Sequence, residues 1–283
     1  MTPPKKSWRI IDLIDWGTNH FTKRGIENAR REMEWFLCDV LNYQRIDLYL
    51  KFENTLKNYE LDKLRKMVQR RITGEPFQHI IGKAPFYMRD FIVNNHVLIP
   101  RPETEILIDI LKKNGSNPSL LDIGTGSGCI AITCALENLS KKIVATDISQ
   151  NALDIACTNM KLHSINYIQT ICHNFLKKDF KTKFDVVVSN PPYIGINEIN
   201  LLDDEVRNYD PTISLTDGKD GLTFYRHFAH KFDDLVISGG YILLEIGGNQ
   251  HKGLIENIFS DKGLKTKFFK DLQNDWRAVE VRA

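Results

Sequence analysis

The sequence predicts an α/β protein: a small N-terminal helical-bundle domain, then a mainly parallel sheet with an antiparallel edge. Residues 8 to about 72 carry apolar side chains at helical spacing, without strand-like alternation or glycine-rich turns. From Ser119 onward, short apolar strands alternate with helices, as in sheets that helices cover on both faces. Two closing strands, near 264–270 and 277–282, have only a short connection, which permits an antiparallel edge.

The helical domain is assigned to residues 1–84. Between Glu27 and Leu41, apolar side chains recur every three or four positions among charged ones, which indicates an amphipathic helix. A second stretch of this kind runs from Leu61 to Val68 and is rich in lysine and arginine. Such a basic cluster is more often a solvated helix face than a docking patch, although a partner with an acidic surface could use it.

A β-hairpin linker is predicted over residues 85–100. The apolar, β-prone runs 91–93 and 96–99 flank Asn94-Asn95, and asparagine tolerates the positive φ angles of a two-residue turn. Pro100-Arg101-Pro102 then stiffens the exit from the hairpin. The second domain accordingly spans residues 101–283.

Within the second domain, apolar runs and helical periodicity predict the order of the elements. The predicted strands are 120–123, 142–146, 166–171, 184–189, 241–246, 264–270 and 277–282, and the predicted helices are 103–113, 128–137, 150–161 and 220–232. Ligands bind outside the carboxyl ends of the strands in open α/β sheets, so residues just after these strands are the candidates for a site.

Composition excludes several classes of protein. The 283 residues are 42% hydrophobic and 26% charged, with a formal net charge of +2, so no strong field attracts nucleic acid. No apolar run approaches the length of about 20 residues that crosses a bilayer, and the amino end lacks the apolar segment of a secretory signal. The five cysteines show no metal-binding spacing and suit a reducing compartment. We expect a cytoplasmic protein with no metal site and no membrane contact.

A glycine-rich loop, Gly124-Thr125-Gly126-Ser127-Gly128, lies where the first strand gives way to a helix. Glycines allow a sharp turn and close approach of a ligand, but the spacing differs from the GxGxxG of dinucleotide-binding proteins. Asp147 ends the next strand, about 20 residues further on, where an acidic side chain can accept both ribose hydroxyls. It could instead cap the following helix, a role that Ser149 fills equally well. Together, the loop and Asp147 favour an adenosine-containing ligand.

The buried strand 184–189 ends in Asn190-Pro191-Pro192-Tyr193. Two consecutive prolines fix two φ angles and remove two N–H donors, which leaves a rigid corner with free carbonyl oxygens. The Asn190 side-chain oxygen and the Pro191 carbonyl can each accept one N–H of a planar NH₂ group, and Tyr193 can stack on that plane. Such a corner orients a weakly nucleophilic nitrogen by position and hydrogen bonding, without a metal or a strong base.

In this order, the glycine loop, Asp147 and the Asn190–Tyr193 corner resemble class I S-adenosylmethionine-dependent methyltransferases that act on nitrogen. The segment 99–105, Ile-Pro-Arg-Pro-Glu-Thr-Glu, is similar to the linker motif of the release factor glutamine methyltransferases, the HemK/PrmC family. Segments 217–222 and 244–247 fit this family, so the resemblance covers essentially the whole chain. It implies a Rossmann-like class I methyltransferase sheet behind a helical domain that docks the substrate.

The resemblance also implies S-adenosyl-L-methionine as cofactor and a glutamine side-chain amide as methyl acceptor, in the Gly-Gly-Gln motif of class-one peptide chain release factors. The implied cofactor contacts are Gly124, Thr125, Gly126, Ser127, Gly128, Asp147, Phe175 and Asn190. The implied substrate contacts are Asn190, Pro191, Pro192 and Tyr193, with Asn190, Pro191 and Tyr193 as catalytic residues. The chain departs from the pattern at Asn174-Phe175, where many relatives carry Asp-Trp, so an amide replaces the acidic acceptor for adenine's amino group.

A nucleic-acid amino methyltransferase is the main alternative, because the exocyclic nitrogen of adenine or cytosine is also a planar NH₂ group. Such an enzyme flips its base and holds the phosphate backbone, and we see neither a strongly basic stripe nor a long recognition insert after Tyr193. A non-catalytic cofactor-binding module would not need the Asn190–Tyr193 corner, and a dehydrogenase fits neither the glycine spacing nor the lack of an acid–base pair. We therefore expect a monomeric enzyme that binds release factors and makes no direct contact with nucleic acid.

Overall fold

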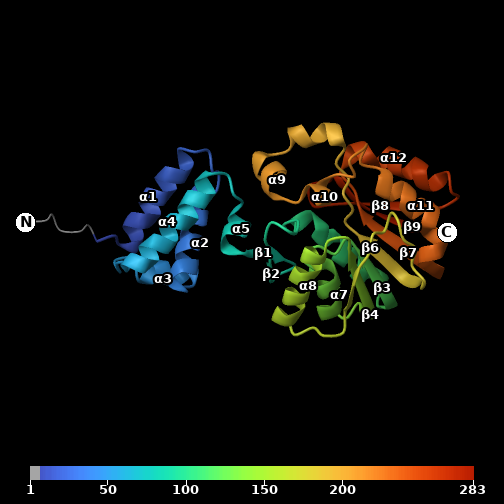
Figure 1. Ribbon diagram of the computed structural model, residues 1–283, viewed down its shortest axis with the longest axis horizontal. Helices are drawn as coiled ribbons and strands as arrows, with labels where there is room; N and C mark the ends of the chain where they lie inside the picture. The colour runs from blue at the N-terminus through green and yellow to red at the C-terminus, as the bar shows by residue number, and fades with distance from the viewer. Residues whose placement is uncertain (1–6) are drawn as a thin grey trace, which may run out of the picture. The chain divides into compact units, whose positions relative to one another are not determined.

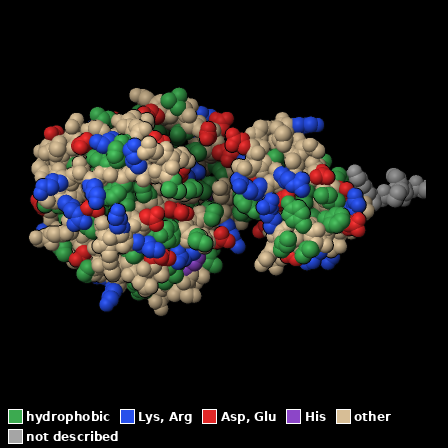
Figure 2. All heavy atoms as spheres, turned by 180° about the vertical axis from the view of Figure 1, so that it is seen from behind, with side chains coloured by type: hydrophobic (Ala, Val, Ile, Leu, Met, Phe, Trp, Pro, Cys, Tyr) green, Lys and Arg blue, Asp and Glu red, His purple; other side chains and the backbone are tan. Residues whose placement is uncertain are grey.

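The computed structural model describes residues 7–283, which divide after Gly82 into two compact units (Figure 1). Residues 1–6, on which the expectation about a secretory signal partly depends, lie outside the described residues. Among residues 7–283, no helix combines the length and the apolar character that a membrane crossing requires. On the face of the second unit that Figure 2 draws, basic and acidic side chains are interspersed.

The first unit consists of helices packed around a single apolar core. Its helices are α1 (Ile10–Thr22), α2 (Ala29–Leu41), α3 (Arg45–Leu50), α4 (Asn58–Ile72) and α5 (Phe77–Ile81). The predicted helical periodicity is confirmed, because Met33, Phe36 and Leu37 of α2 are fully buried in this core. Helices α1 and α2 approach closely, since a Cβ at Gly17 would lie 2.9 Å from the Met33 Cε atom.

The β-hairpin lies earlier in the chain than the sequence predicted. Strands β1 (Lys83–Phe86) and β2 (Arg89–Ile92) pair antiparallel, and the turn is Tyr87-Met88, with φ angles of 49° and 60°. The prediction of a hairpin turn at Asn94-Asn95 was wrong: the chain does turn there, with the Val97 N–H donating to the Asn94 carbonyl at 3.2 Å, but no strand follows the turn before β3. An interaction distant in sequence stabilises the Tyr87 turn, because the Tyr87 N–H donates to Glu105 Oε1 at 2.7 Å. The following apolar run is buried without forming a strand, in a cluster that includes Val93, Val97, Ile99 and Ala152.

The second unit contains a seven-stranded sheet with the order β5-β4-β3-β6-β7-β9-β8. Its strands are β3 (Asn117–Ile123), β4 (Ser140–Asp147), β5 (Gln169–Cys172), β6 (Phe184–Ser189), β7 (Val236–Glu245), β8 (Lys265–Lys270) and β9 (Trp276–Arg282). The first five pair parallel, whereas β9 pairs antiparallel with both β7 and β8. The predicted mainly parallel sheet with an antiparallel edge is confirmed.

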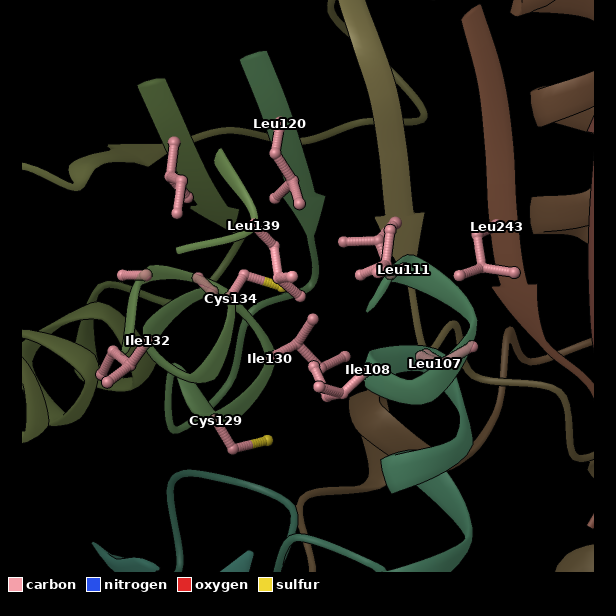
Figure 3. Packing of buried hydrophobic residues seen from close by; sticks show 14 of the residues in the cluster. Leu107, Ile108, Leu111, Leu120, Cys129, Ile130, Ile132, Cys134, Leu139 and Leu243 are labelled. Atoms are coloured by element: carbon pink, nitrogen blue, oxygen red, sulfur yellow. The ribbon is translucent and has the colours of Figure 1, made fainter. Parts of the chain in front are cut away.

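Helices cover both faces of this sheet (Figure 1). One face packs against α6 (Glu105–Asn114) and α7 (Cys129–Leu136), with α8 (Gln150–Leu162) beside α7. Figure 3 shows Leu107 and Ile108 of α6 and Ile130 of α7 below Leu120 and Leu243 of the sheet. The other face packs against α11 (Thr223–Leu235) and α12 (Asn249–Ser260). Adjacent strand residues alternate between the two cores, because successive side chains point to opposite faces.

Two parts of the second unit were not anticipated. Helix α12 was missed, although His251, Ile255 and Phe259 follow helical spacing and are buried. Between β6 and α11, the chain forms the short helices η2 (Ile196–Leu201), α9 (Asp204–Tyr209) and α10 (Thr212–Leu215). Residues of this connection line the cavities described below. A further short helix, η1 (Pro102–Thr104), begins the run that leads into α6.

Candidate functional site

The glycine loop turns sharply between β3 and α7. Gly124, Gly126 and Gly128 have φ angles of 75°, 54° and 81°, a region that L side chains adopt at a cost. The N–H groups of Gly124 and Thr125 both donate to the Thr146 carbonyl, at 2.8 and 2.9 Å, which fixes the loop to the end of β4. A Cβ at Gly124 or Gly126 would meet no atom within 4 Å, so the backbone there borders open space.

Beneath the loop lies Asp122, a fully buried carboxylate on β3. Its Oδ2 accepts a hydrogen bond from the Thr125 hydroxyl at 2.7 Å, whereas Oδ1 has no hydrogen-bond partner within residues 7–283. Burial raises the pKa of Asp122 to about 7, against the opposing hydrogen bond from Thr125. Asp122 therefore supports the shape of the loop from below and does not line a cavity.

Asp147 lies at the carboxyl end of β4, directly beside the loop. Its Oδ2 accepts the Gly126 N–H and its Oδ1 accepts the Ser149 N–H, both at 2.9 Å. The N-cap of α8 is Ser149, whose hydroxyl accepts the Ala152 N–H. Burial raises the pKa of Asp147, and the two backbone hydrogen bonds oppose that increase. Because each carboxylate oxygen has a second lone pair, Asp147 can still accept hydroxyl groups of a ligand.

A cavity of about 290 Å³ opens at this edge of the sheet. Of the residues predicted to contact a cofactor or substrate, those lining it are Gly124, Thr125, Gly126, Ser127, Asp147, Phe175, Asn190, Pro191 and Pro192. Gly128 does not line the cavity. It allows α7 and α8 to pack closely, since a Cβ there would lie 2.9 Å from Ile132 Cδ1 and 3.2 Å from Ala156 Cβ.

An aromatic cluster forms one end of the cavity. Phe175 is 6% exposed and packs against Phe228 with ring centroids 4.6 Å apart. The preceding Asn174 uses its Oδ1 to accept the Leu176 N–H at 3.1 Å, which shapes the loop that carries Phe175. This end of the cavity offers an apolar ring face beside an amide side chain.

The corner after β6 brings Asn190 to the lining of the same cavity. Strand β6 is fixed to β3 there by the Ser189 hydroxyl, which donates to the Ile123 carbonyl at 2.6 Å. The Asn190 Nδ2 donates to the Thr104 hydroxyl at 3.1 Å. Neither Asn190 Oδ1 nor the Pro191 carbonyl accepts a hydrogen bond within residues 7–283. Two free acceptors therefore lie at adjacent positions of a rigid corner.

Tyr193 faces a second cavity, of about 240 Å³, and not the first one. The two cavities share the lining residues Leu98, Arg101, Asn190 and Ser214, so they meet at the Asn190 corner. The Tyr193 hydroxyl donates to Glu245 Oε1 at 3.3 Å, and burial raises the pKa of Tyr193 well above its ordinary value. A hydrogen bond therefore orients the ring that was expected to stack on the acceptor.

Two glycines make room for Tyr193. A Cβ at Gly221 would overlap the Tyr193 carbonyl oxygen and lie 2.9 Å from its carbonyl carbon. A Cβ at Gly247 would lie 2.8 Å from Tyr193 Cδ2 and 2.6 Å from His251 Nδ1. The segments 217–222 and 244–247, singled out by resemblance alone, thus both pack against this corner.

Glu245 and Arg101 line the second cavity and were not assigned a role from the sequence. Glu245 is 1% exposed, and burial raises its pKa to about 7, with Thr104 and Arg277 opposing the increase. A glutamate inside the apolar run of a strand was the signal that could have identified it. Arg101, from the proline-rich segment, pairs with buried Asp210 at 2.6 Å and links that segment to the connection after β6.

No group of three or more His, Cys, Asp or Glu side chains within the described part of the chain could hold a metal ion.

Comparison with known proteins agrees with this geometry. Residues 12–82 match the PrmC N-terminal domain and residues 102–201 match the methyltransferase small domain. The chain is similar to the release factor glutamine methyltransferases of Geobacter sulfurreducens (36% identity, 93% of this chain and 92% of that protein) and Chlorobaculum tepidum (35%, 92% and 93%). It is also 36% identical to a bifunctional methyltransferase of Rickettsia bellii, covering 97% of this chain but 55% of that protein.

Among solved structures, a methyltransferase from Pyrococcus furiosus shares the fold, with a TM-score of 0.52 at 18% identity over 80% of this chain and 98% of that one. The sequence matches extend over both units at an identity well above this level. The protein is a methyltransferase, and it belongs to the release factor glutamine methyltransferase family.

Proposed function

We propose that this enzyme transfers a methyl group from S-adenosyl-L-methionine to the side-chain amide nitrogen of the glutamine in the Gly-Gly-Gln motif of class-one peptide chain release factors. The observation that carries the proposal is the pair of free acceptors, Asn190 Oδ1 and the Pro191 carbonyl, where two cavities meet. A planar amide presents two N–H donors, and these acceptors match that number.

The first cavity fits the cofactor. Open space beside Gly124 and Gly126 lets a ligand approach the backbone closely. Asp147 would accept the ribose hydroxyls, and the Phe175 end of the cavity would take the adenine ring. When bound, the cofactor supplies a methyl group on a positively charged sulfur.

Asn190 and Pro191 would act by orienting the acceptor nitrogen. The lone pair of an amide nitrogen is delocalised into the carbonyl, so the nitrogen is a poor nucleophile. Acceptors on both N–H bonds hold the amide plane in place. They also stabilise the positive charge that would develop as the N–C bond forms and the bond between sulfur and the methyl carbon breaks, which leaves S-adenosylhomocysteine. The Glu245 hydrogen bond would keep Tyr193 beside the amide. One proton of the amide nitrogen then leaves to solvent, which restores a neutral amide.

The second cavity would admit the glutamine and the chain on either side of it. It is lined by Arg101, Glu103 and Arg277, whose charges can bind a peptide backbone, and by Tyr193 and Leu215. A Gly-Gly segment has no side chains and needs little room to enter this cavity. We further propose that the helical unit docks the body of the release factor and that the enzyme works as a monomer in the cytoplasm.

The test is tandem mass spectrometry of a purified release factor after incubation with the enzyme and S-adenosylmethionine. We expect one added methyl group, about 14 Da, on the Gly-Gly-Gln glutamine, with folded release factor a better substrate than a short peptide because remote contacts contribute binding energy. The matched control is a release factor whose glutamine is replaced by glutamate, which should remain unmodified. Label transfer to DNA or RNA with none to the release factor would overturn the proposal in favour of the nucleic-acid alternative.

A further inference from the structure

An asparagine side chain can present either its oxygen or its NH₂ group to a ligand, because the two are nearly equal in size. In this site only one orientation is productive. If the Asn190 oxygen faces a substrate NH₂ group, it accepts a hydrogen bond from it. If the Asn190 NH₂ group faces the substrate NH₂ group, two donors meet and no hydrogen bond forms. Something must therefore fix which atom of Asn190 faces the substrate.

The partner that can fix it is Thr104, a residue 86 positions earlier in the chain. Its side chain is 3% exposed, and its hydroxyl accepts the Asn190 Nδ2–H at 3.1 Å. No hydrogen bond within residues 7–283 reaches Asn190 Oδ1. While Nδ2 is bound in this way, Oδ1 is the atom left for a ligand.

The Thr104 hydroxyl acts as an acceptor in this contact. A threonine hydroxyl has one proton, and it can either donate to Asn190 or accept from it. In the structure it accepts, with the Asn190 Nδ2–H as the donor. Thr104 also lowers the pKa of the Glu245 carboxyl group, against the effect of burial. The Tyr193 hydroxyl donates to the same carboxyl group at 3.3 Å.

We infer that Thr104 is a positioning residue, whose buried hydroxyl accepts from Asn190 Nδ2 and thereby keeps the Asn190 oxygen turned toward the substrate NH₂ group. The inference rests on the proposed function, since it concerns the nitrogen to be methylated. It also gives a reason for the site's selectivity, because a fixed acceptor pair favours an amide NH₂ over a carboxylate, which has no N–H to donate.

The experiment compares Thr104→Val with Thr104→Ser. Valine keeps the shape of threonine but removes the hydroxyl, whereas serine keeps the hydroxyl. In single-turnover methyl transfer to release factor at saturating cofactor, we expect Thr104→Val to lower the rate on the order of 10-fold or more, and Thr104→Ser to retain most of it. The dissociation constant of S-adenosylhomocysteine should change by less than about 3-fold in both, because the glycine loop and Asp147 are untouched.

Combining Thr104→Val with Asn190→Asp distinguishes a positioning role of Thr104 from a role in packing alone. In Asn190→Asp the two carboxylate oxygens are equivalent, so no orientation needs to be held. Adding Thr104→Val to Asn190→Asp should then cost less than about 3-fold in rate, well below its cost in the wild-type background. An equal cost in both backgrounds, or a Thr104→Ser variant as slow as Thr104→Val, would overturn the inference. Failure of the wild-type enzyme to methylate release factor would instead refute the proposed function, which makes the two failures distinguishable.

Discussion

Substitution of Gly221 by alanine tests whether the loop 217–222 sets the position of Tyr193. Gly221 has a φ angle of 78°, and its N–H donates to Asp217 Oδ1 at 3.0 Å. Gly218, in the same loop, has a nearly equal φ angle of 72°, but a Cβ there meets no atom within 4 Å. Gly218→Ala is therefore a control that carries the same backbone strain without the contact.

The strain common to both variants is about 1–2 kcal/mol in the free energy of unfolding, the cost of a left-handed conformation for a residue with a Cβ atom. Gly221→Ala carries an additional cost, because its Cβ would overlap the Tyr193 carbonyl group. Both sides of this overlap are backbone or Cβ, so no side-chain rotation relieves it. The chain at Tyr193 must move by roughly 1 Å, and a displacement of that size in an active site can reduce the rate on the order of 100-fold.

The assay is single-turnover methyl transfer with saturating cofactor and release factor, together with thermal unfolding of each variant. Gly218→Ala should lose stability but keep a near wild-type rate per folded molecule. Gly221→Ala should lose stability and also most of its rate. Equal rates for the two folded variants would refute the claim that Gly221 positions Tyr193.

Two further predictions concern the cofactor side of the site. Asp147→Ala should weaken S-adenosylhomocysteine binding in calorimetry by roughly 1.5–3 kcal/mol, the scale of hydrogen bonds to a charged group. Unchanged affinity in a folded variant would mean that Asp147 only stabilises the loop and does not bind the ligand. The pKa of Asp122 is raised to about 7 in the folded state, so the folded protein binds the extra proton and stability falls as the pH rises from the ordinary carboxyl range through about 7. Asp122→Asn should remove that part of the decline between about pH 4 and about pH 7 in denaturant unfolding. Parallel curves for the two proteins would contradict the burial argument.

Much of the sheet was predictable because its signals are local. Strands such as β3 and β6 are apolar runs bounded by turns, and parallel pairing places their carboxyl ends at one edge. That geometry alone brings the glycine loop, Asp147 and the Asn190 corner to one cavity. Gly128 was predicted as a cofactor contact because it belongs to the glycine motif, but it lies away from the cavity. It allows two helices to pack closely.

What the sequence could not provide depends on contacts between distant residues. Tyr87-Met88 is not a typical turn dipeptide, and Glu105, 18 positions later, holds that turn in place. The contact between Asn190 and Thr104 spans 86 positions and leaves no periodic trace in the sequence. Glu245 was visible as a charge in an apolar strand, but its partners appear only once β7 lies beside the corner.

We propose that the Asn190 corner accelerates transfer by holding the acceptor nitrogen, and single-turnover kinetics of Asn190 variants can show whether it does. Asn190→Ala removes one acceptor and should lower the rate on the order of 100-fold or more, with only a modest loss of cofactor affinity. Asn190→Asp keeps an acceptor oxygen and should retain more activity than Asn190→Ala. An Asn190→Ala enzyme that transfers methyl to release factor at a near wild-type rate would show that Asn190 does not act in this way.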